Sequence, residues 1–208
     1  MRILPYSEAV ELTTPCHDVW VDAHHHAWGL WQERLLSDAE FFKPLTSAER
    51  YAVLHRHICD YAGRHLEGKV GNAPSLDFYA QILDNRALVR FKHVDANLKP
   101  RTYPTEQQQH LDRQEFTEHL AEQLELDGIP AKLTVLTVGF TLTPGEDQLS
   151  QIAVICRAPE LLYSYLIYSI EEGHGEDGTD VQPFPGIEPP GPRVTSRRRS
   201  AQADDASQ

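Results

Sequence analysis

The sequence predicts an α+β fold in which an N-terminal pair of helices packs against an antiparallel sheet of about five strands. Two changes along the chain indicate this. Apolar residues recur every three or four positions at first, and alternation replaces that spacing near residue 78. From residue 171 an acidic, Gly-rich and Pro-rich segment has too few apolar residues to fold. We therefore expect an N-terminal arm over 1–13, a single α+β domain over 14–170 and a disordered tail over 171–208.

Two helices are predicted before the sheet. The first begins at Thr14, because Pro15 is well suited to the first helical position. Its apolar stripe includes three tryptophans: Trp20, Trp28 and Trp31. The second begins near Ser47 and ends near Gly68, since glycine commonly follows the last residue of a helix. The tryptophan stripe is expected to be either core or an interface with a partner.

A β-hairpin is predicted next, with strands over 78–83 and 86–92 and with Asp84 and Asn85 as its two turn residues. This turn pairs Leu83 with Arg86. Because side chains alternate across a strand, one face of the hairpin is apolar and the other is polar. The polar face holds Asp77, Tyr79, Arg90 and Lys92.

One helix is predicted between this hairpin and a second one. It begins at Thr105, with Gln108 at capping-box spacing, and it ends at Gly128. The second hairpin covers 132–157. A final strand is expected over 161–170, although the same residues also suit a helix. Since hairpins join antiparallel neighbours, we expect the whole sheet to be antiparallel.

Composition favours a cytoplasmic protein that binds other proteins. The chain has 31 acidic and 19 basic residues, a formal net charge of -12 that repels a nucleic-acid backbone. It contains no uninterrupted apolar run of the length that spans a bilayer, so no membrane association is expected. Its three cysteines have spacings that fit neither a disulfide framework nor a zinc site. The histidine run 24–26 does not predict a metal site, because consecutive helical residues point in different directions.

The polar face of the first hairpin is the candidate binding site. Its residues, with one acid that follows the hairpin, are Asp77, Tyr79, Arg90, Lys92 and Asp95. A guanidinium group suits the binding of a carboxylate or another anion. The plainer interpretation is an exposed face of salt bridges, each contributing less than about 1 kcal/mol. No catalytic residue, metal ligand or cofactor is assigned.

The alternative is a metal-dependent nuclease or phosphoryl-handling toxin built on residues 77–92. In nucleases of the PD-(D/E)xK type, one strand presents an Asp and the next presents a carboxylate two residues before a Lys. Here Asp77 would hold the metal, Lys92 would stabilise negative charge and Arg90 would grip a phosphate. Glu49 or Asp95 would complete the site. Because Arg90 stands where the second acid belongs, this alternative ranks below binding.

Several motifs in residues 78–157 carry a resemblance. They are an RFKKLD-like strand, an IPT-x-Q helix start, an LPGIP-like loop and a GY-x-L strand that precedes a strand ending in Cys. The matching residues are Arg90, Phe91, Lys92, Asp95, Thr105, Gln108, Gly128, Ile129, Pro130, Gly139 and Cys156. The chain departs from the pattern at His93, where a second Lys is expected, and at Tyr103-Pro104, where Ile-Pro is expected.

These motifs resemble a widespread group of uncharacterised bacterial proteins found in mobile-element and toxin–antitoxin-type gene neighbourhoods. The resemblance implies no catalytic residues. It implies a non-enzymatic interaction protein of a toxin–antitoxin or defence-type system. Such a protein would bind a cognate protein encoded by a neighbouring gene, and would neutralise or sense it.

Overall fold

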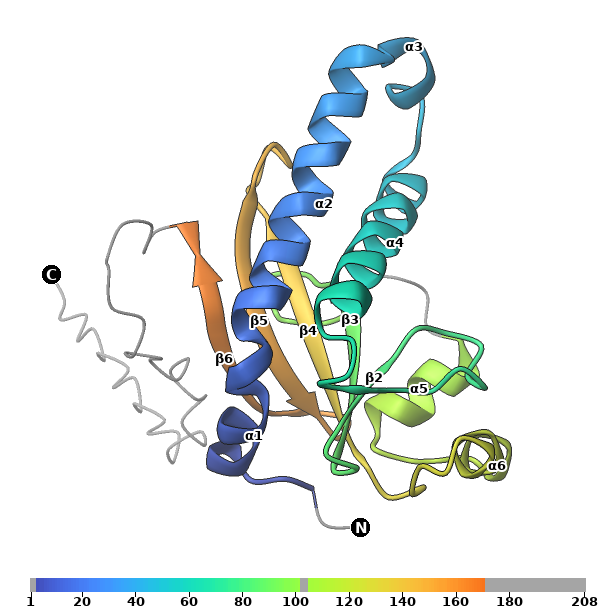
Figure 1. Cartoon of the computed structure of the whole chain (residues 1–208). Coiled ribbons are helices and arrows are strands. Elements are labelled where there is room, and N and C mark those ends of the chain that lie inside the picture. Colours follow the sequence, from blue (N-terminus) through green and yellow to red (C-terminus); the bar gives the residue numbers. More distant parts are fainter. Residues whose placement is uncertain (1–2, 102–104, 171–208) are drawn as a thin grey trace, which may run out of the picture.

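The computed structural model describes residues 3–101 and 105–170, and Figure 1 shows their arrangement. The helices are α1 (Tyr6–Thr13), α2 (His17–Ser37), α3 (Ala39–Phe42), α4 (Ser47–His65), α5 (Glu106–Asp112) and α6 (Glu118–Leu126), with a 3-10 turn, η1 (Thr14–Cys16), before α2. The strands are β1 (Gly71–Asn72), β2 (Gln81–Leu83), β3 (Ala87–His93), β4 (Thr134–Leu142), β5 (Leu149–Arg157) and β6 (Leu161–Ser169). The predicted α+β class is confirmed. The tail predicted over 171–208 lies outside the described residues.

The six strands form one sheet in the order β1-β2-β3-β4-β5-β6. The predicted all-antiparallel pairing is wrong at one place, because β3 and β4 are parallel. The chain leaves β3 at His93 and enters β4 at Thr134. A connection of this length, with helices in it, allows the crossover that parallel neighbours require. The single helix predicted in this connection is also wrong, since α5 and α6 are separate helices with Gln114 between them in the left-handed region (φ 61°).

The first hairpin is present, but its predicted register is wrong by one residue. Leu83 pairs with Ala87 and Gln81 pairs with Val89, so three residues form the loop instead of two. Asp84 and Asn85 do adopt the positive φ angles that were expected, 48° and 50°. A shift of one residue moves a side chain to the opposite face of its partner strand. Tyr79 and Arg90 therefore do not share a face.

The helices α1, α2 and α4 cover one face of the sheet. The predicted starts of the helical pair are close to those observed, and α4 begins with a capping box in which Thr46 Oγ1 accepts from Glu49 N (3.3 Å). The tryptophan stripe is core: Trp20, Trp28 and Trp31 are 0%, 8% and 6% exposed. The expected N-terminal arm includes α1, which packs against β6 through hydrogen bonds from Tyr165 and Tyr163 to this segment.

The other face carries two smaller apolar clusters. Leucines of α5 and α6 pack with residues of β2, β3 and β4. The loop after β3 covers β5, because Val94 and Leu98 share a cluster with Ala153 and Ile155. Gly139 permits this cover, since a Cβ there would lie 2.9 Å from Val94 Cγ1 and 2.6 Å from Ile155 Cδ1. The loop over 94–101 is thereby held close to the end of the β4–β5 hairpin.

Candidate functional site

Arg90, the centre of the predicted binding face, is part of the interior. Its side chain is 4% exposed and forms an ion pair with Asp112 at the end of α5. Its Nε donates to Thr137 Oγ1 at 3.1 Å. Because these neighbours occupy the guanidinium group, Arg90 anchors the crossover helix to the sheet and is not open to an external anion.

Lys92 lies half-buried beside α4. Burial, together with the positive charge of Arg90, lowers the pKa of its ammonium group. The nearby Cys59 Sγ lies 3.6 Å from His55 Nε2, and the two residues are four positions apart on α4, a spacing that places them on one helix face. Burial raises the pKa of Cys59 to about 12, so the thiol is protonated at neutral pH and is a poor nucleophile.

Of the three remaining predicted residues, Tyr79 lies near Cys59 of this cluster, whereas Asp77 and Asp95 lie elsewhere. Asp77 is exposed and precedes β2. Tyr79 accepts a hydrogen bond from Gln81 Nε2 at 3.0 Å, and burial raises its pKa to about 12. Asp95 Oδ1 accepts from the backbone N–H groups of Asn97 (2.8 Å) and Lys99 (2.9 Å), which shapes the loop after β3. The five predicted residues therefore do not form one site.

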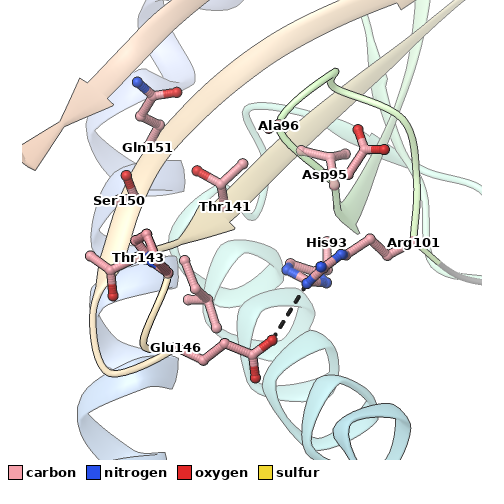
Figure 2. A pocket seen from close by; sticks show the side chains of 12 residues that line it. His93, Asp95, Ala96, Arg101, Thr141, Thr143, Glu146, Ser150 and Gln151 are labelled. Atoms are coloured by element: carbon pink, nitrogen blue, oxygen red, sulfur yellow. Dashed lines mark hydrogen bonds and ion pairs between the residues drawn. The ribbon is translucent and has the colours of Figure 1, made fainter.

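A different group of polar side chains surrounds a pocket of about 480 Å³ between the loop after β3 and the turn of the β4–β5 hairpin. Figure 2 shows side chains from both segments directed toward this pocket. Its polar wall includes Asp95, Arg101, Thr141, Glu146, Ser150 and Gln151. Of the predicted site residues, Asp95 lines it. The pocket size is typical of sites for small molecules.

Glu146, in the β4–β5 turn, is the centre of a charge network at this pocket. Its carboxylate forms an ion pair with Arg50 of α4 and accepts from the Tyr51 hydroxyl at 3.3 Å. Arg101 Nη1 lies 3.4 Å from the same carboxylate (Figure 2). Glu146 has a φ of 52°, which costs energy for a residue other than glycine. The three contacts hold the turn in this conformation.

His93 lines the inner wall of the pocket and is 5% exposed. Its ring stacks on Tyr51, with centroids 3.8 Å apart and planes 22° apart. Burial and the charge of Arg101 lower the pKa of His93 to about 4, so its ring is neutral at neutral pH. Within the described residues, the buried Nδ1 of His93 has no hydrogen-bond partner.

The end of the helical hairpin formed by α2, α3 and α4 is the second notable surface. Gln32 Nε2 of α2 donates to Asp147 O in the β4–β5 turn at 3.3 Å, and the later residues of α2 extend past that turn (Figure 1). Leu36 and Phe41 at this end are 85% and 62% exposed. We call this apolar end, defined by Leu36 and Phe41, the hairpin tip.

The described residues contain no group of three or more His, Cys, Asp or Glu arranged to hold a metal ion. None of the described helices has the length and apolar character needed to cross a membrane. Comparison of the chain with protein-family models, with curated proteins and with solved structures finds no match.

Proposed function

We propose that this chain is a non-enzymatic protein-binding protein. Its partner is a cognate protein encoded by a neighbouring gene in a bacterial toxin–antitoxin or defence-type system. The exposed hairpin tip supports binding, since large apolar side chains at interfaces supply much of the binding energy. The biological setting rests on the resemblance of residues 78–157 alone.

The packing of the tip favours a rigid anchor. Phe42 contacts Trp31 edge to face, with ring centroids 5.5 Å apart, so α3 is attached to the core stripe of α2. The Asp38 carboxylate accepts from Phe41 N at 3.4 Å and caps α3. Phe41 is thereby held pointing outward, which reduces the entropy lost when a partner covers it.

Charge indicates the chemistry of the partner. The exposed charged residues around the tip are Glu33, Arg34, Asp38, Glu40, Lys43 and Glu49, four acids against two bases. The chain as a whole has a net charge of -12. A partner with a basic rim around an apolar groove would complement this surface. The same charge disfavours nucleic acid as a partner.

The tryptophan stripe does not offer a binding surface, because Trp20 packs against Phe91 of the sheet and Trp31 packs against Phe42. The alternative of a nuclease or phosphoryl-handling toxin also has less support than the spacing of Asp77, Arg90 and Lys92 in the sequence indicated. Its three residues were to face one another across the hairpin, whereas Arg90 is paired with Asp112 and Asp77 precedes β2.

Co-expression with each neighbouring gene product, followed by affinity capture and titration of the purified pair, tests the proposal. The double variant Leu36→Asp, Phe41→Asp should bind the captured partner at least roughly tenfold more weakly, since one interface anchor contributes about 1–2 kcal/mol or more. Leu126→Asp is the matched control, because Leu126 is 80% exposed on α6 and away from the tip. Equal affinity for the double variant and wild type would contradict a role for the tip.

Expression of the chain alone separates binding from the alternative. A protein-binding antitoxin or sensor should leave growth unchanged and, in the antitoxin case, rescue cells that express the neighbouring gene. Growth inhibition with magnesium-dependent cleavage of DNA or RNA, lost in folded Lys92→Ala or Asp77→Ala, would establish the nuclease alternative instead.

A further inference from the structure

The charges around the pocket between the loop after β3 and the β4–β5 turn do not all cancel. Glu146 and Arg50 form an ion pair and neutralise each other. Arg101 makes one longer contact with the already paired carboxylate, at 3.4 Å, and 51% of its side chain is exposed. The contacts of Asp95 described above are with backbone N–H groups, which leave its negative charge in place. One positive and one negative group thus remain at the pocket.

These groups surround His93. Burial is the main cause of the lowered pKa of His93; Arg101 and Arg50 lower this pKa further, while Glu146 and Asp95 raise it, so all four charges act on this one ring. His93 is 5% exposed, and its Nδ1 has no hydrogen-bond partner within the described part of the chain. A buried polar atom without a partner costs about 1–3 kcal/mol. This atom is itself enclosed, so it makes the inner wall of the pocket polar without being open to a ligand.

We propose that this pocket binds a small zwitterion, an α-amino acid or a short free peptide, whose carboxylate meets Arg101 and whose ammonium group meets Asp95. This site is separate from the hairpin tip and does not depend on partner binding there. The volume of about 480 Å³ accommodates a molecule of that size. Hydroxyl and amide groups of Thr141, Ser150 and Gln151 are available to the rest of the ligand.

Other ligand classes complement the pocket less well. A phosphate group would gain Arg101 but would be repelled by Asp95, and it carries no ammonium group to offset that repulsion. A neutral sugar would displace water from Arg101 and Asp95 without offering an opposite charge to either, which carries a desolvation cost. A zwitterion is the small-molecule class that satisfies both groups at once.

Isothermal titration of the full chain with each common α-amino acid, with glycylglycine, with glucose and with inorganic phosphate tests this assignment. At least one zwitterion should bind with a stoichiometry of one. The N-acetylated and C-amidated forms of that ligand should each bind roughly tenfold or more weakly, because each lacks one charge.

Two variants locate the site. Arg101→Gln and Asp95→Asn should each weaken binding roughly tenfold or more, and Asn keeps an Oδ1 acceptor for the loop. Arg56→Gln is the control, because it removes the same charge from a side chain that is 79% exposed on α4. Circular dichroism verifies that each variant is folded. The proposal is overturned if no zwitterion binds at millimolar concentration, if both variants bind as wild type does, or if glucose or phosphate binds in preference.

Discussion

Replacing Asp112 by alanine should destabilise the protein by about 2 kcal/mol, because it leaves the Arg90 guanidinium buried without its counter-charge. Breaking a fully buried ion pair costs roughly 3–5 kcal/mol. The Asp112 side chain is 24% exposed, so water can reach the vacated position and the lower end of that range applies. Asp112 is also the last residue of α5, where a negative charge interacts unfavourably with the helix dipole. The alanine variant removes this interaction, which offsets about 0.3–1 kcal/mol of the loss.

Urea unfolding of the full chain measures this effect, and a double-mutant cycle with Arg90→Met isolates the pair. The double variant Arg90→Met, Asp112→Ala should be closer in stability to wild type than the single Asp112 variant, since an apolar pair leaves no buried charge. A loss of less than about 0.5 kcal/mol in Asp112→Ala would refute the reasoning. If Arg90→Met then abolished partner binding in a stable protein, the sequence prediction of a binding role would be the correct one.

Two further predictions concern the core. Gln114→Leu should lower the free energy of unfolding by about 3 kcal/mol. The Gln114 side-chain amide donates to Val135 O (2.9 Å) and Arg157 O (2.8 Å) and accepts from Val135 N (2.7 Å). Each of these buried backbone groups left unpaired costs roughly 1–3 kcal/mol. Urea unfolding measures it, and a change under about 1 kcal/mol would show that water replaces the amide. Burial lowers the pKa of His24 from 6.5 to about 4, so between these values the unfolded state binds more protons and stability falls as pH falls. At about 1.36 kcal/mol per pKa unit, wild type should lose about 3 kcal/mol more than His24→Leu between pH 7 and pH 4, and parallel pH profiles would contradict this origin.

Much of the local structure follows from the sequence because its causes are local. Helix α4 was predicted from its apolar stripe and from a glycine just after its end, and Gly68 does adopt a positive φ of 76°. The β4–β5 hairpin was predicted from alternation on both sides of a Pro-Gly turn, and it forms over the expected residues. These signals depend on residues a few positions apart, which interact before any tertiary contact is made.

The candidate site was predictable only in part. Asp95 lies at the pocket. Arg90 was predicted to lie on the surface because of its spacing in the strand, but it packs against Asp112 in the interior. Alternation shows which side chains of one strand share a face. Which side chains of the neighbouring strand lie on that same face depends on the loop length, and one extra loop residue reverses it. Asp84 and Asn85 suit both a two-residue and a three-residue loop, so the sequence did not decide between them.

The sequence by itself determined the α+β class, the helical pair, the approximate positions of β2 to β6 and the acidic charge of the chain, since composition and short-range periodicity are sufficient for these; it did not predict the short strand β1. Only the tertiary structure decided the parallel pairing of β3 with β4, the burial of the tryptophan stripe and the position of the pocket. Arg50, His93, Arg101 and Glu146 belong to four segments that no sequence spacing relates. They meet because a crossover connection and the close approach of Val94 to Gly139 bring the loop after β3 onto the end of the β4–β5 hairpin.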